Sequence, residues 1–316
     1  MILRLIERIA VLAASLAVSS ILVFGFMAVL PGDPARVALG VNASDQAVTV
    51  LRADFGLDRP LVSQYFSWVG GLLRFDLGDS YISRAPIGPQ VADRLQVSLW
   101  LVVTSMVIAV VIAVPVGSLM AVWHRKISGL LLSAASQVGV AIPAFLAGIL
   151  FITVFAVRLG WLPANGWTPP AEDPVMFLKQ LTLPALSLGL VQGAVLARYV
   201  RSSVLDILRE DFLRTARAKG LRPMPALARH GLRNASVPVV TVLGLQLATL
   251  LIGAVVVERV FVIPGLGSLL LDSVANRDLI LVQDVVMILV VAVLVVNFVV
   301  DLLYVAIDPR MRAGAR

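Results

Sequence analysis

Six long apolar segments constrain the fold of this 316-residue chain more than any other feature. They cover residues 9–30, 95–123, 127–157, 181–200, 237–257 and 285–307. A helix needs about 20 mainly apolar residues to cross the hydrocarbon core of a bilayer. Lipid offers the backbone no hydrogen-bond partners, and the strands of a barrel would alternate over about ten residues. The sequence therefore predicts an all-α membrane protein with six transmembrane helices.

The composition agrees with a bilayer as the solvent. Hydrophobic residues make up 59% of the chain and charged residues 14%, whereas soluble domains average about 45–50% and about 25%. The absence of cysteine from the sequence excludes disulfides, thiol catalysis and cysteine-ligated metals. The two histidines, His124 and His230, stand beside arginines and not at a metal-binding spacing. We expect the chain to bind no cofactor or metal.

The distribution of basic residues predicts the orientation. If the N-terminus is cytoplasmic, sixteen of the 26 Lys and Arg residues fall on the inside, and four fall in the two short outside loops. Basic residues accumulate in cytoplasmic loops, so we expect both the N-terminus and the C-terminus in the cytoplasm. These loops account for most of the net charge of +7. We therefore expect contacts with membrane lipid and none with nucleic acid.

The spans divide the chain into four predicted regions. Residues 1–30 form the cytoplasmic N-terminus and the first transmembrane helix, a retained anchor because its apolar run is too long for a signal peptide. Residues 31–94 form an external loop region. Residues 95–307 form a five-helix core that includes a large cytoplasmic loop at 201–236. Residues 308–316 form a cytoplasmic tail.

The external region contains a predicted helix at residues 62–75. Aromatic and aliphatic side chains, including Tyr65, Trp68 and Leu72, recur there at near-helical spacing. Trp and Tyr are favoured at membrane–water interfaces. The helix is therefore interpreted either as lying on the outer interface or as packing on other external residues, and the spacing does not separate these alternatives.

The loop at 201–236 predicts a helix–turn–helix elbow. Leu205, Leu208, Phe212 and Ala216 recur on one helical face. Gly220 is a typical residue for ending that helix, and two prolines at 223 and 225 prevent its continuation. A second short helix is expected at about 226–234. Two interpretations remain open from the spacing: a basic patch that fixes the topology, or a surface on which a partner protein docks.

The sequence of this elbow resembles a known family. Residues 211–221 read DFLRTARAKGL, and residues 229–235 read RHGLRNA. Both resemble the coupling loop of permeases from binding-protein-dependent ABC importers, in particular the dipeptide/oligopeptide branch. Further matching stretches are LPGDP at 30–34, FGLDRPL at 55–61, FDLGDS at 75–80, PGLG at 264–267, DLLY at 301–304 and DPR at 308–310. The sequence departs from the general importer motif, because Arg214, Thr215 and Ala216 stand where Glu-Ala-Ala is usual.

The resemblance implies a fold, partners and a location. The fold is that of a type I ABC importer permease, and the long external loop resembles one of the two permease types of the branch. The implied partners are a second, homologous permease in a heterodimer, two ATPase modules and an external substrate-binding protein. The implied location is the bacterial inner membrane. The implied cargo is di- or oligopeptides, with nickel complexes, glutathione or oligosaccharides as alternatives.

The resemblance also implies an ATPase-coupling site. Its residues are Asp211, Phe212, Arg214, Thr215, Ala216, Arg217, Ala218, Lys219, Gly220 and Leu221. Phe212 and Ala216 are expected to supply the apolar contact. The chain has no glycine-rich phosphate-binding motif of its own. We therefore expect no enzyme activity here, and ATP hydrolysis in the partner subunits.

Four polar residues within the spans are candidates for lining a transport pathway. They are Gln192, Gln246, Thr249 and Asn297. Polar and small residues also serve helix packing in membranes, so this alternative remains open. A secondary transporter is disfavoured because no carboxylate is visible in mid-membrane: Glu258 falls at the outer end of the fifth span, and Asp301 near the cytoplasmic end of the sixth. A membrane-embedded protease is disfavoured because the spans contain no catalytic motif.

Overall fold

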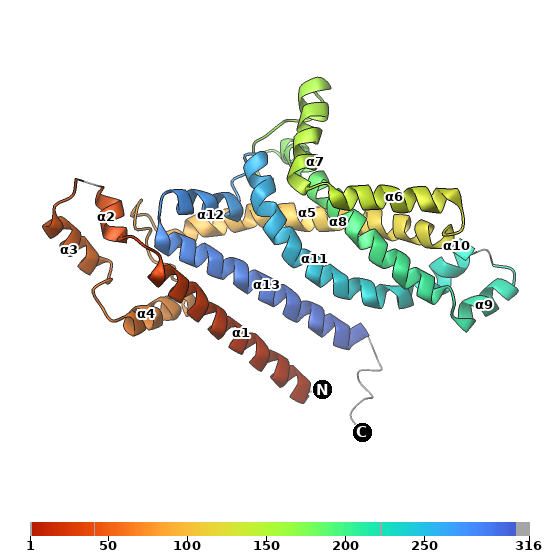
Figure 1. The fold of residues 1–316 in the computed structure, drawn as a ribbon, viewed down its shortest axis with the longest axis horizontal. Coiled ribbons are helices and arrows are strands. Elements are labelled where there is room, and N and C mark those ends of the chain that lie inside the picture. Colours follow the sequence, from red (N-terminus) through yellow and green to blue (C-terminus); the bar gives the residue numbers. More distant parts are fainter. Residues whose placement is uncertain (1, 41, 222, 308–316) are drawn as a thin grey trace. The chain divides into compact units, whose positions relative to one another are not determined.

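The regular structure is helical in this computed structural model, which describes residues 2–40, 42–221 and 223–307 (Figure 1). Within these residues, five helices are long and apolar enough to cross a membrane, and the count is six if one bent pair of helices is taken as a single span. The predicted all-α membrane fold is confirmed. The predicted cytoplasmic tail at 308–316 lies outside the described residues.

In chain order the helices are α1 (Ile2–Val29), α2 (Pro34–Leu39), α3 (Asp45–Asp54), α4 (Leu61–Leu73), α5 (Ile87–Val122), α6 (Ile127–Ala141), α7 (Ala144–Phe151), the π-helix η1 (Ile152–Arg158), α8 (Pro174–Ile207), α9 (Asp211–Ala218), α10 (Pro223–Ala226), the π-helix η2 (Leu227–Gly231), α11 (Leu232–Val260), α12 (Leu266–Ala275) and α13 (Leu279–Ile307). The chain divides into two compact units. The first unit comprises Met1–Ser98 with Pro264–Val295, and the second comprises Leu99–Ile263 with Val296–Arg316, as far as these ranges are described.

The first unit contains a small helical cap. The Asp33 carboxylate accepts a hydrogen bond from the Ala35 amide at 3.0 Å and so caps the start of α2. Ala35 is buried against two side chains of α3, Val48 and Leu51. The predicted helix at 62–75 is present as α4, and it packs against α1: the Tyr65 hydroxyl lies 2.9 Å from that of Ser20. Neither predicted alternative described this contact with a span.

The core of the first unit joins α5 to two helices that lie far from it in the sequence. Buried apolar residues of α5, α12 and α13 pack together there: Ile87, Val91, Leu266, Leu269, Leu281 and Val285. The α12 backbone is also fixed to α5, because the Leu266 amide donates a hydrogen bond to the Ser98 hydroxyl at 2.8 Å. Both helices α5 and α13 begin earlier than the predicted spans at 95 and 285.

The second unit is organised around α8, which contacts α6, α7 and α11. Glycines allow close approach of α5 to α8. A Cβ atom added at Gly117 would lie 2.6 Å from the Ala197 carbonyl oxygen, and one added at Gly189 would lie 2.7 Å from an Ile108 side-chain atom. Small residues of this kind let helix backbones pack closely in membranes.

The third span is not the uninterrupted helix that the apolar run at 127–157 predicted. The helix axis bends by 98° between α6 and the α7–η1 segment. Pro143 explains the break, because proline has no amide proton and disfavours the helical conformation of the preceding residue. Ile142 accordingly has an extended backbone, with φ −85° and ψ 120°.

Candidate functional site

The predicted elbow is a set of short helices between α8 and α11. The helix α8 ends at Ile207, a turn follows, and α9 begins at Asp211. Beyond α9 the chain turns at Gly220 and continues through α10 and η2 into α11 (Figure 1). The single predicted helix through Leu205 and Ala216 is therefore broken at residues 208–210. We refer to residues 208–231 as the elbow.

A closed apolar cluster supports the elbow from within. Leu213 is fully buried, and Ala216 and Ala226 pack with it. This corrects the predicted apolar contact face, because Ala216 is only 8% exposed and faces the cluster, whereas Phe212 is 39% exposed. The break after Ile207 is the reason. It starts a new helix whose inward face is set by residues 213 and 216, so the phase of the preceding helix does not carry over.

The outer surface of the elbow is polar and charged around Phe212. Arg214 and Asp211 form an ion pair at 3.5 Å, with both side chains mostly exposed, so the pair adds little stability. The Thr215 hydroxyl donates to the Asp211 carbonyl oxygen at 2.9 Å. Ala218 and Lys219 are exposed, and the side chain of Arg217 lies outside the described residues. A single exposed aromatic ring thus projects from a rigidly supported, partly basic surface.

Gly220 ends α9 as the sequence predicted. Its φ of 92° lies in the region that favours glycine. The turn is closed by the Leu221 amide, which donates to the Ala216 carbonyl oxygen at 3.3 Å. An added Cβ atom would meet no other atom within 4 Å. Backbone conformation, and not space, therefore requires glycine here.

The four predicted pathway residues do not share one environment in the second unit. Gln192 on α8 and Gln246 on α11 are buried. Asn297 on α13 is half-buried. Thr249 is exposed, and its hydroxyl donates to the Leu245 carbonyl oxygen at 3.1 Å. The burial of the two glutamines fits helix packing, while Thr249 is accessible.

Two segments that lie far apart in the sequence meet in the first unit. The Ser80 hydroxyl, from the stretch at 75–80, donates a hydrogen bond to the Asp278 carboxylate, which also accepts one from the Tyr81 amide at 3.3 Å. Burial, together with the nearby carboxyls of Asp284 and Asp278, raises the pKa of Tyr81 to about 12. Tyr81 is therefore an uncharged hydroxyl at physiological pH. The motif and the start of α13 form one fixed structure.

Asp284 is a buried carboxylate that the sequence reasoning missed. The predicted sixth span began at 285, but α13 begins at Leu279 and includes Asp284, which is fully buried. The indole nitrogen of Trp68 donates to one carboxylate oxygen at 2.8 Å, while the other has no hydrogen-bond partner within the described part of the chain. Trp68 in the predicted external helix was only a partial signal: a half-buried indole nitrogen usually finds an acceptor, but the sequence does not say which residue accepts.

Comparison with known proteins identifies the family. The family model described as "Binding-protein-dependent transport system inner membrane component" matches residues 113–313, and the model of the N-terminal part of such components matches residues 1–102. The chain belongs to this family. It is a permease subunit of an ABC importer of the dipeptide/oligopeptide type, in the bacterial inner membrane, where it is a multi-pass protein.

Similar proteins support this assignment at two levels. The permease is 42% identical to the glutathione transport system permease protein GsiC of Escherichia coli strain K12 over 310 residues, which is 97% of this chain and 98% of that protein. GsiC of Shigella dysenteriae serotype 1 gives the same values. Permeases of this kind work with ATPases and binding proteins.

Solved structures show the fold of the permease. An inward-facing structure of the MetNI methionine ABC transporter matches with a TM-score of 0.57 at 21% identity, covering 69% of this chain and 96% of that one. An amino acid ABC transporter solved with histidines matches with a TM-score of 0.51 at 18% identity, covering 68% and 93%. The type I importer fold that the resemblance implied is thus confirmed.

Proposed function

We propose that this permease forms half of a pathway for short peptides and is coupled to ATPase subunits through the elbow. A second, homologous permease supplies the other half, two ATPase modules bind on the cytoplasmic side, and an external binding protein delivers the cargo. In this arrangement both termini are cytoplasmic, and residues 31–94 face outside. The chain itself hydrolyses no ATP and needs no cofactor.

The observation that carries the coupling proposal is the exposure of Phe212 on a firmly supported helix. Aromatic side chains are frequent anchors of protein interfaces. Phe212 is 39% exposed, and Arg214 and Lys219 of the same segment are exposed as well. The cluster beneath it, centred on Leu213, links the anchor to the end of α8. A displacement of Phe212 by a bound ATPase would therefore move the end of α8 and, through η2, the start of α11.

The chain packs closely at Gly231, where the elbow joins α11. A Cβ atom added at Gly231 would lie 2.7 Å from a Leu227 methyl group and 3.4 Å from a Leu213 methyl group. The start of α11 is thus packed directly on the cluster below α9. In the proposed mechanism, motion of the ATPases moves α8 and α11 together. The pathway-lining roles of Gln192, Gln246, Thr249 and Asn297 remain part of this proposal, with Thr249 best placed by its exposure.

The cargo proposal is supported by the relatives. The similar permease GsiC is named for glutathione transport, and glutathione is itself a short peptide. We propose that this importer takes up di- or oligopeptides, glutathione included.

Site-specific cross-linking tests the coupling proposal. The sequence contains no cysteine, so Arg214→Cys places one thiol on the exposed surface of the elbow. A photoactivatable cross-linker on this thiol is expected to capture an ATPase subunit in the assembled importer. The matched control is Ser83→Cys, an exposed position in the region expected outside, which should capture none. An ATPase adduct at 83 and none at 214 would contradict both the coupling surface and the orientation.

A further inference from the structure

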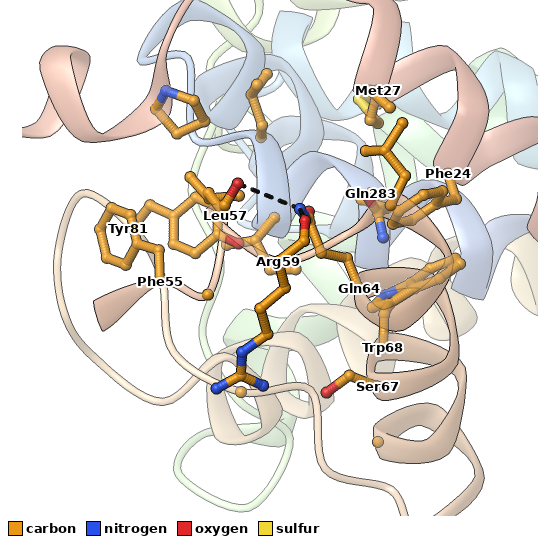
Figure 2. A pocket seen from close by; sticks show the side chains of 18 of the residues that line it. Phe24, Met27, Phe55, Leu57, Arg59, Gln64, Ser67, Trp68, Tyr81 and Gln283 are labelled. Carbon is orange, nitrogen blue, oxygen red and sulfur yellow. Dashed lines mark hydrogen bonds between the residues drawn. The ribbon is translucent and has the colours of Figure 1, made fainter. Parts of the chain in front are cut away.

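A pocket of about 510 Å³ lies within the first unit, and none of its lining residues belongs to the elbow or to the proposed pathway residues. It is lined by the outer part of α1, the ends of α3 and α4, the turn at 76–81 and the start of α13. Arg59 is among the lining residues, and in the view of Figure 2 it lies between Phe55 and Tyr81 on one side and Phe24 and Trp68 on the other. Ligand pockets commonly have volumes of about 300–1,000 Å³, so the space suits a small molecule.

Within the described part of the chain, one arginine that lines the pocket, Arg59, has no ion-pair partner. Arg52 and Asp33, which also line it, pair with each other at 3.5 Å. No carboxylate among the described residues pairs with the Arg59 guanidinium. This side chain folds over the turn at Gly56, where an added Cβ atom would lie 3.5 Å from Nε of Arg59. Arg59 is thus a cation available to a ligand.

The backbone that carries Arg59 is held in place by α4. The side-chain amide of Gln64 donates hydrogen bonds to the carbonyl oxygens of Arg59 at 2.8 Å and Leu57 at 3.3 Å, and a dashed line in Figure 2 marks a bond from Gln64. A fixed backbone reduces the entropy lost when a ligand binds.

Two carboxylates complement this cation. Asp76 and Asp79 line the pocket from the turn that follows α4, and both are exposed. One oxygen of Asp76 accepts a hydrogen bond from the Gly78 amide at 3.0 Å. The positive φ of Gly78, 67°, shapes this turn. As far as the residues are described, the pocket therefore offers the unpaired Arg59 and two carboxylates, which suits a ligand that carries both an ammonium and a carboxylate group.

Aromatic pairs supply the apolar part of the walls. Phe24 of α1 stacks on Trp68 of α4 with ring centres 6.1 Å apart. Phe55 and Tyr81 stack at 4.2 Å. All four residues line the pocket. The Arg84 guanidinium lies 4.5 Å from the centre of the Phe55 ring, so small apolar or aromatic side chains of a ligand would contact the ring edges and the faces that remain uncovered.

We infer that this pocket binds a short peptide by its two charged ends, with Arg59 receiving the carboxylate and Asp76 and Asp79 the ammonium group. The aromatic pairs contact the side chains between them. The inference rests on the proposed function, because it makes the pocket an acceptor site for cargo on the outer part of the permease. The excess of carboxylates disfavours an anionic lipid headgroup. A zwitterionic phospholipid is the competing occupant.

Direct binding measurements test the site. The importer complex is placed in nanodiscs of phosphatidylcholine without binding protein or ATP, and binding of radiolabelled trialanine and Ala-Phe-Ala is measured. Saturable binding of both peptides is expected. N-acetylated, C-amidated trialanine should bind about tenfold or more weakly, because charge-assisted hydrogen bonds at both ends are lost. This comparison needs no variant and so does not depend on folding.

Two variants and a control locate the site. Arg59→Ala and Asp79→Asn should each weaken binding of free trialanine about tenfold. Arg36→Ala should leave it unchanged, because Arg36 is an exposed arginine that pairs with Asp45 outside the pocket. Absence of saturable binding, equal binding of the capped peptide, or equal effects of all three variants would overturn the inference.

Two further measurements distinguish a lipid in the pocket, and a failure of the proposed function, from a failure of the peptide site. The first replaces phosphatidylcholine with phosphatidylethanolamine. If trialanine binding is then lost, and if the permease retains phosphatidylethanolamine only when Arg59 is present, the pocket binds a lipid headgroup and the inference is overturned. ATP-driven peptide uptake measured on the same preparation reports the proposed function. Uptake that persists without peptide binding to this pocket would refute the acceptor site alone. Absence of uptake with intact peptide binding would refute the proposed function alone.

Discussion

Truncation of Phe212 is the sharpest test of the elbow. The ring is 39% exposed, and burial of a complete Phe side chain contributes about 1.5–3 kcal/mol. Docking against an ATPase would bury the exposed two-fifths, which corresponds to about 1 kcal/mol by area and about 2 kcal/mol if Phe212 is a well-packed anchor. We therefore expect Phe212→Ala to weaken ATPase binding about 5- to 30-fold and to reduce uptake.

The neighbouring residue provides the matched control. Leu213 is fully buried in the supporting cluster, so Leu213→Ala should lower the stability of the fold by about 2–5 kcal/mol. It removes no exposed contact. Titration of detergent-purified permease complex with ATPase subunit, corrected for the folded amount, separates the two effects. The reasoning is refuted if Phe212→Ala binds the ATPase as tightly as the native chain does, or if both variants differ from it only in folded amount.

Three further predictions follow from the same structure. An impermeant thiol reagent should label Ser83→Cys but not Lys219→Cys in intact cells, and the reverse pattern would invert the proposed orientation. Gly220→Val should cost about 1–3 kcal/mol of backbone strain and reduce peptide uptake at normal expression. Gly220→Asn should retain peptide uptake, because asparagine tolerates positive φ. Equal uptake by both variants would show that the turn is not strained. Gly117→Ala should lower the melting temperature, because overpacking there costs about 1–3 kcal/mol. Gly25→Ala should not lower it, because an added Cβ atom at Gly25 meets nothing within 4 Å. Equal melting temperatures of the two variants would contradict the close packing of α5 on α8.

The apolar and helical character of the spans could be predicted from sequence because hydrophobic length is a property of each segment alone. The break at Pro143 was also present in the sequence, but the surrounding run of apolar residues hid it. Proline is tolerated inside membrane helices, as at Pro115 in α5, so its presence does not by itself predict a break. The bend depends on whether neighbouring helices accept the freed backbone groups.

The inward face of the elbow could not be predicted because it depends on one turn. Periodicity carried from Leu208 through Phe212 to Ala216 assumes an unbroken helix. The break after Ile207 resets the phase, and Leu213 takes the buried position. The glycine at 220 was predicted correctly because its requirement is local: a reversal of the chain that favours positive φ.

The hydrogen bonds of Asp278 and Asp284 were beyond sequence reasoning for a different reason. Their partners, Ser80 and Trp68, come from the other end of the chain. No local pattern encodes such pairing. The same limit applies to the pocket, whose lining residues come from segments between Phe24 and Gln283.

The central claim is that this permease imports short peptides by coupling to ATPases, and reconstitution tests it most directly. Proteoliposomes containing this chain, its second permease and the ATPase subunits are given binding protein and labelled peptide on the outside. The account predicts uptake that requires ATP inside the vesicles and is lost when this chain is omitted or carries Phe212→Ala. Uptake driven by a proton gradient without ATP, or unaffected by omission of this chain, would contradict it.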